Sequence, residues 1–109
     1  MADPVAGTWA SAPNDEGASL HVTISPCGAK FCGVITKVLG SDNTSSVGKR
    51  MIWGMSPAGS GVYKGGKVWA PDTDKTYKGK LELSGNSLKV SGCVLGGAVC
   101  RGNTFKRLN

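Results

Sequence analysis

The feature that most restricts the fold is an alternation of apolar and polar residues in short segments that are separated by turn-forming residues. It is clearest in residues 61–83, where two alternating segments flank Pro71-Asp72-Thr73-Asp74. A period of two residues is that of a β-strand, and proline with aspartate favours a tight turn. The stretch therefore predicts a β-hairpin.

A turn centred on Thr73 fixes which residues of this hairpin share a face. It places Trp69 opposite Tyr77, and Gly65 opposite Leu81. Because side chains alternate between the faces of a sheet, the three lysines Lys64, Lys78 and Lys80 then point the other way. The predicted inner face consists of aromatic and aliphatic side chains and one lysine: Tyr63, Lys67, Trp69, Tyr77, Leu81 and Leu83.

Three further reversals follow from local residues, at Ala29-Lys30, Gly85-Asn86 and Gly96-Gly97. They bring apolar faces together, with Lys37 and Arg101 also falling on the inner side. The expected partners are Val22 with Lys37, Ile24 with Ile35, Leu83 with Leu88, Leu81 with Val90, Val90 with Asn103, and Leu88 with Phe105.

With Trp9 anchoring a first strand in residues 5–11, the pattern gives about eight short strands and no helical period. The predicted fold class is all-β, a small antiparallel up-and-down barrel formed by one domain over residues 1–109. Closure is preferred to an open sheet because it leaves no exposed edge strands. Residues 40–48 read as a surface loop, residues 49–55 as a short apolar element and residues 56–60 as a turn.

The four cysteines allow three disulfide pairings. Cys27 and Cys32 are symmetric about one predicted turn, and Cys93 and Cys100 about another, so register favours two local bridges. Long-range pairings would stabilise more on the chain-entropy model, at roughly 4 to 5 kcal/mol against roughly 2 kcal/mol for each local loop. A zinc site and four free thiols are the other readings, and zinc is disfavoured because neither pair has the C-x-x-C spacing. Local disulfides imply an oxidising compartment.

Size and charge limit the function without selecting it. The chain has 109 residues, 17 glycines and a net charge of +6. Such a charge indicates an acidic partner or serves solubility alone. No apolar run approaches the roughly 18 residues of a membrane-spanning helix. The chain opens on Met1-Ala2-Asp3-Pro4 without a hydrophobic leader, which suggests a mature exported form, periplasmic or secreted, whose signal peptide has been removed.

Several of these segments together resemble a bacterial family catalogued as domain of unknown function 2147. They are residues 3–9 (DPVAGTW), 25–28 (SPCG), 31–33 (FCG), 63–71 (YKGGKVWAP), 75–80 (KTYKGK) and 88–93 (LKVSGC). The resemblance runs from Asp3 to about Arg107, with a shorter loop at residues 40–48 and Phe105 where the family has tryptophan. It implies export and a lipocalin-like barrel, and it supplies no catalytic residues.

No set of residues forms a familiar catalytic motif. The only histidine, His21, alternates onto a polar face, and Asp72 with Asp74 suits a turn better than a metal site. Bridged cysteines would offer no nucleophile. The sequence therefore predicts a binding protein and not an enzyme, without cofactor or metal.

Two kinds of binding fit the pattern. In the first, the barrel holds a small amphipathic ligand, with cations for an anionic head group beside apolar walls. The candidate ligand-binding residues are Lys37, Tyr63, Lys67, Trp69, Tyr77 and Arg101. The competing reading is that the cations reach water at strand ends while the aromatics fill a small core.

In the second kind of binding, an outer lysine face attracts an acidic polymer or an envelope partner. This face carries Lys64, Lys78, Lys80 and Lys89. Nucleic acid is not expected, because the predicted aromatics alternate away from the lysines and leave no surface for base stacking. The sequence does not define the ligand, the oligomeric state or the biological process.

Overall fold

The computed structural model describes residues 4–13, 17–41, 45–71, 74–94 and 99–108. Their secondary structure consists of eight β-strands. The strands are β1 (Gly7–Ser11), β2 (Ser19–Cys27), β3 (Lys30–Leu39), β4 (Arg50–Gly59), β5 (Val62–Ala70), β6 (Lys75–Ser84), β7 (Ser87–Val94) and β8 (Val99–Arg107). No helix in the described residues is long and apolar enough to cross a membrane.

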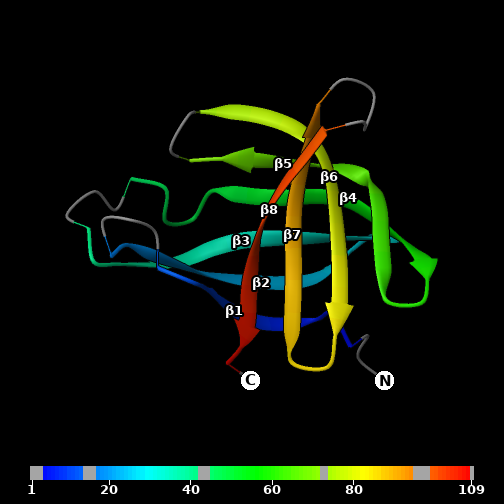
Figure 1. Cartoon of the computed structure of the whole chain (residues 1–109), viewed down its shortest axis with the longest axis horizontal. Coiled ribbons are helices and arrows are strands. Elements are labelled where there is room, and N and C mark those ends of the chain that lie inside the picture. Colours follow the sequence, from blue (N-terminus) through cyan, green and yellow to red (C-terminus); the bar gives the residue numbers. More distant parts are fainter. Residues whose placement is uncertain (1–3, 14–16, 42–44, 72–73, 95–98, 109) are drawn as a thin grey trace.

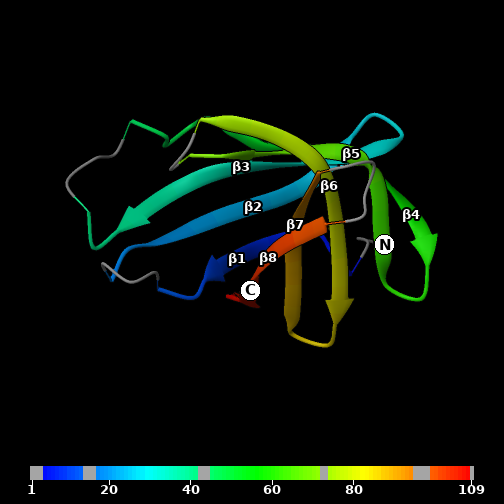
Figure 2. The same ribbon diagram turned by 45° about the horizontal axis from the view of Figure 1, so that its top comes forward.

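Each strand pairs with the next one in the chain, and β8 pairs back with β1, so the sheet closes into an antiparallel barrel (Figure 1). Figure 2 shows how β2, β3 and β6 curve around the interior. The predicted fold class is therefore confirmed. Closure leaves no unpaired edge strand along the sheet, which removes the usual site of edge-to-edge aggregation.

The core lies inside the barrel and takes large side chains from all eight strands. Trp9, predicted as the anchor of the first strand, is 0% exposed. Phe31 and Tyr63 meet edge to face with ring centroids 5.7 Å apart, an arrangement that aromatic pairs favour. Met55 extends over Gly79, where an added Cβ would lie 2.2 Å from the Met55 methyl group. The interior glycine therefore provides the room that Met55 occupies.

The seam between β1 and β8 is short, and one cation strengthens it. Trp9 pairs with Arg107 across the seam, and the guanidinium carbon lies 4.3 Å from the centre of the indole. The Arg107 guanidinium also donates hydrogen bonds to the carbonyls of Ala6, at 3.2 Å, and Pro4. The Trp9 indole nitrogen donates to the carbonyl of Val5 at 3.0 Å. Arg107 thus joins the last strand to the chain that precedes the first.

The last two hairpins have the predicted registers. Across β6 and β7, Leu83 pairs with Leu88 and Leu81 with Val90. Across β7 and β8, Val90 pairs with Asn103 and Leu88 with Phe105. The β6–β7 turn lies at Gly85-Asn86 as predicted, since Ser84 pairs with Ser87, and the predicted β7–β8 turn at Gly96-Gly97 lies outside the described residues.

The predicted register of the β5–β6 hairpin is wrong. Trp69 pairs with Thr76 and Tyr63 with Leu81, because the four-residue connection is centred half a residue earlier than Thr73 and the strands contain a bulge. At the bulge, Gly65 and Gly66 of β5 face the single residue Gly79 of β6. One extra residue reverses the faces beyond it, so the positions between the bulge and the loop differ from the prediction.

The predicted register of the β2–β3 hairpin is also wrong. The turn is one residue earlier than expected, and Ile24 pairs with Gly33 and not with Ile35. A second bulge at Thr36 then shifts the pairing, so that Lys37 pairs with His21. The hydroxyl of Thr36 donates to the carbonyl of His21 at 3.3 Å, which supports the bulged backbone.

The segment after the first three strands is more regular than its sequence suggests. The sequence predicts only a short apolar element in residues 49–55 and a turn in residues 56–60. Instead, β4 runs from Arg50 to Gly59 and includes Pro57, which pairs with Tyr63. The reversal lies at Ser60 and Gly61, both with positive φ. The pairing shifts between Pro57 and Gly59, so the proline is accommodated at an irregular position in the strand.

Both local disulfides are confirmed. Cys93 and Cys100 pair directly across β7 and β8, with their Cα atoms 4.0 Å apart. Cys27 and Cys32 are bonded with Cα atoms 5.6 Å apart, although they lie diagonally across the β2–β3 turn. No cysteine is left free. The disulfides are consistent with an extracytoplasmic protein.

Replacing Arg107 tests the seam. We expect Arg107→Met to lower the free energy of unfolding by about 1 to 3 kcal/mol, because the methionine keeps apolar contact with Trp9 but loses the charged hydrogen bonds. Urea titration monitored by tryptophan fluorescence measures the change. Lys106→Met, at the exposed neighbouring position, serves as the control and should shift stability by less than about 0.5 kcal/mol. Equal effects of the two substitutions would contradict the proposed importance of the seam.

Removing the β7–β8 disulfide tests its contribution. We expect Cys93→Ala with Cys100→Ala to destabilise the barrel by about 2 kcal/mol, since the bridge closes a short loop in the unfolded chain. Thermal and urea unfolding of the double variant give the value. The double variant should still show the β-sheet circular dichroism of the parent, because the interior contacts of β7 remain. A fully unfolded variant would show that the bridge contributes more than loop closure.

Candidate ligand-binding cavity

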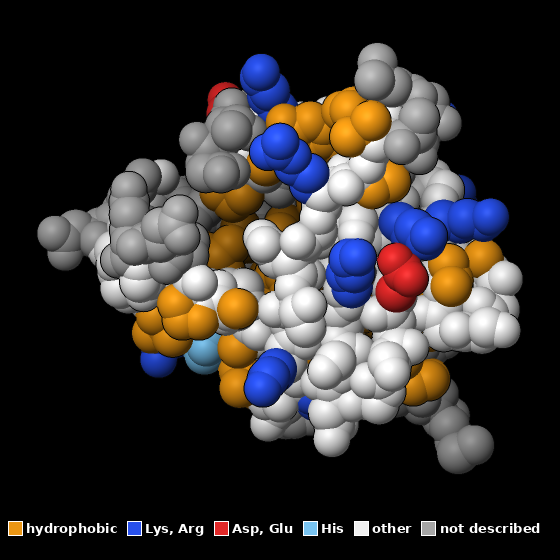
Figure 3. All heavy atoms as spheres, in the orientation of Figure 1, with side chains coloured by type: hydrophobic (Ala, Val, Ile, Leu, Met, Phe, Trp, Pro, Cys, Tyr) orange, Lys and Arg blue, Asp and Glu red, His pale blue; other side chains and the backbone are white. Residues whose placement is uncertain are grey.

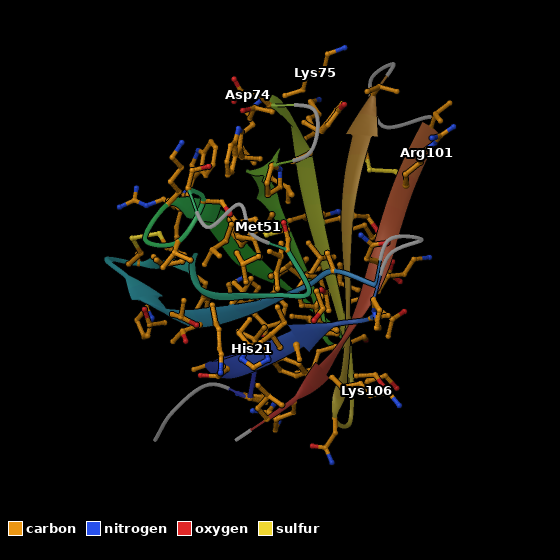
Figure 4. All side chains as sticks on the ribbon, turned by 90° about the vertical axis from the view of Figure 1, so that its left-hand side faces the viewer. His21, Met51, Asp74, Lys75, Arg101 and Lys106 are labelled. Carbon is orange, nitrogen blue, oxygen red and sulfur yellow. A yellow bond between two sulfur atoms is a disulfide. The ribbon has the colours of Figure 1, made fainter. Side chains whose placement is uncertain are left out.

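The two ends of the barrel differ. The connections β1–β2, β3–β4, β5–β6 and β7–β8 meet at one end, which we call the mouth, because the chain runs up and down in sequence order. The turns β2–β3, β4–β5 and β6–β7 meet at the other, closed end. Figure 4 views the molecule from the side of the mouth, with Met51 near the centre and Arg101 on β8.

A cavity of about 880 Å³ occupies the mouth end of the interior. Figure 3 shows hydrophobic side chains recessed in a hollow at the left of the molecule, in the direction of the β1–β2 and β3–β4 connections. Every strand contributes to the walls: Ser11, Leu20, Val38, Met51, Val68, Tyr77, Val90 and Phe105 are lining residues from β1 to β8 in turn. The cavity is therefore a property of the closed barrel and not of one loop.

Large side chains fill the barrel between the cavity and the closed end. Phe105 lines the cavity and is 2% exposed, and Val90 beside it is 5% exposed. Tyr63 and Leu81, which pair across β5 and β6, belong to the packed core and do not line the cavity. The interior is thus filled at the closed end and hollow toward the mouth.

Two of the predicted ligand-binding residues, Tyr77 and Arg101, do line the cavity. Arg101 pairs with Gly92 across β7 and β8. The Tyr77 side chain packs against the same glycine, and a Cβ at Gly92 would lie 3.0 to 3.2 Å from it. Because Gly92 has no side chain, the Tyr77 phenol and the Arg101 guanidinium can line the cavity from neighbouring positions of the wall.

The other four predicted ligand-binding residues do not line the cavity: Tyr63 lies inside as predicted but belongs to the packed core, and the predicted inward placement is wrong for Lys37, Lys67 and Trp69. The bulge at Gly65 and Gly66 turns Lys67 to the outer face, where it is exposed, and Val68 to the inside. Trp69 does not line the cavity and is partly buried at the edge of the core, with its indole nitrogen donating to Asp74 at 2.8 Å and the Lys49 ammonium 5.4 Å from the ring centre. Lys37 is exposed on β3 because the Thr36 bulge aligns it with His21.

Sequence reasoning missed part of the wall. Met51 and Asn103 line the cavity but were not proposed as ligand contacts. Asn103 was detectable, because Arg101, Asn103 and Phe105 alternate on one face of β8. Met51 was not, since the pairing of β3 with β4 shifts between Gly33 and Val34 and the local pattern of β4 is ambiguous. The first shift in that pairing, between Phe31 and Gly33, is equally hidden from local residues.

Arg101 gives the wall its charge. Among the described lining residues it is the one charged side chain, and the others are apolar, hydroxyl, amide or glycine residues. Within the described part of the chain the one ion pair is Lys80 with Glu82, so no carboxylate there lies within 4.0 Å of the Arg101 guanidinium. A guanidinium next to an apolar wall suits the acidic head group of an amphipathic molecule.

The described residues contain no candidate metal cluster. No three His, Cys, Asp or Glu side chains among them gather closely enough to hold an ion. His21 pairs with Lys37 on the outer side of β2 and β3, away from the cavity lining. The described cavity thus offers binding groups, with a guanidinium, a phenol, an amide and hydroxyls beside aliphatic walls.

A closed antiparallel barrel of eight strands with a cavity open at one end is a lipocalin-like barrel, a fold suited to small ligands. The chain belongs to the bacterial family described as "Uncharacterized protein conserved in bacteria (DUF2147)", which matches residues 7–107. The chain therefore belongs to the same family that its sequence motifs resemble.

Among solved structures, the chain is similar to protein HP1028 from the human pathogen Helicobacter pylori, which is described as belonging to the lipocalin family. The two share 19% sequence identity with a TM-score of 0.79, and the similarity covers 100% of this chain and 85% of that chain. At that identity the likeness establishes the fold alone. No curated protein matches the sequence.

Proposed function

We propose that the protein is an exported, non-enzymatic binding protein that holds a small amphipathic ligand with an acidic head group in the mouth of its barrel. One observation carries this proposal, the combination of a cavity of about 880 Å³ with Arg101 as the charged residue of its described wall. Ligand pockets commonly have volumes of about 300 to 1,000 Å³. The cavity is therefore large enough for a molecule of moderate size.

The order of residues along β8 gives the ligand a direction. Arg101, Asn103 and Phe105 succeed one another on the inner face from the mouth toward the closed end. Alternate residues of a strand are about 7 Å apart, so Arg101 and Phe105 are separated by roughly 13 Å. We place the acidic head group at Arg101 and Tyr77, near the mouth, and the apolar tail against Val90 and Phe105.

The disulfides support export, since they persist in oxidising compartments. We place the protein in the periplasm or outside the cell. The described side chains of the cavity wall offer contacts suited to binding a ligand, which supports the binding role.

Replacing Arg101 tests the head-group assignment. We expect Arg101→Met to weaken binding of dodecanoate about tenfold, because a charge-assisted hydrogen bond is lost while the apolar wall is kept. Binding of 1-dodecanol, which has the same tail without the charge, should be unchanged. Isothermal titration calorimetry measures both affinities.

Lys37→Met is the matched control for this experiment. Lys37 is an exposed cation outside the cavity, so its substitution removes the same charge without touching the wall. It should leave both affinities unchanged. If Arg101→Met binds dodecanoate as tightly as the parent does, the acidic head group is assigned to the wrong place.

Filling the cavity tests whether the ligand binds inside it at all. Ala70 is a small lining residue on β5 near the mouth. We expect Ala70→Trp to reduce binding of both dodecanoate and 1-dodecanol at least about tenfold, since the indole occupies the space of the tail. Thermal unfolding checks that the variant remains folded. A folded Ala70→Trp variant with unchanged affinities would show that these molecules bind elsewhere.

A further inference from the structure

Five lysines lie on the outer face of β5, β6 and β7, and one acidic side chain, Glu82, stands among them in the described part of these strands. We call this the lysine face; it consists of Lys64, Lys67, Lys78, Lys80 and Lys89. In Figure 3, blue side chains gather around a red one over β6 and β7. Lys67 was predicted on the inner side, and the glycine bulge adds it to this face.

Four of these lysines form two pairs that stand directly opposite each other across β5 and β6. Lys64 pairs with Lys80, and Lys67 pairs with Lys78. Like charges at directly opposed positions destabilise a sheet. The Lys80–Glu82 contact is 3.8 Å long between side chains that are 42% and 45% exposed, so it offsets little of this repulsion. Dispersed lysines would give the same solubility without that cost, which points to a use for the concentrated charge.

A tryptophan extends the lysine face. Trp53 of β4 is half-buried and pairs with Lys67, which is exposed on the outer face, so the two positions share that face of the sheet. Across the sheet, Trp53, Lys67 and Lys78 thus form one row of three adjacent strands. The row places an aromatic residue next to two cations, a combination that the sequence analysis does not predict.

We propose that the lysine face binds a linear acidic polysaccharide. Lys78 and Lys80 are about 7 Å apart along β6, and opposed lysines are about 5 Å apart, so the face can contact successive charges of one extended polymer. Trp53 offers a flat surface for a sugar ring beside Lys67. This site is separate from the cavity, because no lysine of the face lines it.

Two other acidic partners fit the face less well. An anionic membrane is normally met with exposed apolar side chains, and the large exposed hydrophobic residues of the described chain, Leu39, Val47, Val94, Val99 and Leu108, lie outside the lysine face. Nucleic acid would use the same cations and an aromatic surface. The disulfides, however, favour an oxidising compartment outside the cytoplasm, and this setting favours an extracellular polymer over nucleic acid.

The test uses two variants with the same net charge. One carries Lys64→Gln, Lys67→Gln, Lys78→Gln and Lys80→Gln. The control carries Lys30→Gln, Lys37→Gln, Lys75→Gln and Lys106→Gln, which are exposed lysines on other parts of the barrel. Binding to a heparin oligosaccharide is titrated by fluorescence anisotropy at several salt concentrations. A single-stranded DNA of equal length and phosphatidylglycerol vesicles serve as the competing partners.

We expect the lysine-face variant to bind heparin at least about tenfold more weakly than the parent does at about 0.1 M salt, with the slope of log K against log salt reduced by about 3. The control variant should lose less than about threefold, since it keeps the opposed pairs. Thermal unfolding of the lysine-face variant should match or exceed that of the parent, because repulsion has been removed.

The proposal is overturned by any of three results. The first is an equal loss of heparin binding in the two variants, which would show an effect of net charge alone. The second is tighter binding of DNA or vesicles than of heparin, and the third is no measurable heparin binding by the parent. If the lysine-face variant melts lower than the parent, the double variant Lys67→Gln with Lys78→Gln decides the outcome. This double variant should reduce the slope of log K against log salt by about 1.4, half of the change expected for the four-lysine variant.

Discussion

The barrel depends on the contact between Trp9 and Arg107, because it joins the two ends of the chain across the shortest seam of the sheet. Only three residue pairs define the register between β1 and β8. The buried indole fills the interior at this point, and the guanidinium covers it while bonding to the backbone ahead of β1. Without that seam the barrel would have two edge strands, β1 and β8, and the cavity would lose one wall.

The cavity follows from a decrease in side-chain size along the strands. On β7 the inward residues are Leu88, Val90 and Gly92 in the direction of the mouth, and on β1 Trp9 is followed by Ser11. Since strands in a closed barrel keep a fixed separation, smaller inward side chains leave space that their neighbours do not fill. The closed end therefore supplies the stability of the core, and the mouth end is left available for a ligand.

Local sequence defines the registers of the last two hairpins better than those of the two hairpins that contain bulges. The registers of β6 with β7 and of β7 with β8 were predictable, because their alternating partners specify them, together with the two-residue turn Gly85-Asn86 between β6 and β7. The bulges at Gly65-Gly66 and Thr36 have no comparable local signal, since they depend on how the strands bend to close the barrel. The barrel, both disulfides and the inward position of Tyr77 and Arg101 therefore agree with the prediction, whereas the predicted faces of Lys37, Lys67 and Trp69 are wrong. The ligand-binding role of Tyr77 and Arg101 stays a prediction.

The bulge in β5 also determines whether Lys67 faces the barrel interior or the outer face. Without the extra residue, Lys67 would point into the interior and require a partner there, because an unpaired ammonium is costly to bury. With the extra residue, Val68 occupies the inward position and Lys67 lies opposite Lys78 on the outer face. Gly66 suits this geometry, since a Cβ there would lie 2.1 Å from the Trp53 carbonyl oxygen. The same two glycines thus leave Arg101 as the charge of the described cavity wall and concentrate the remaining lysines of the hairpin on the outer face.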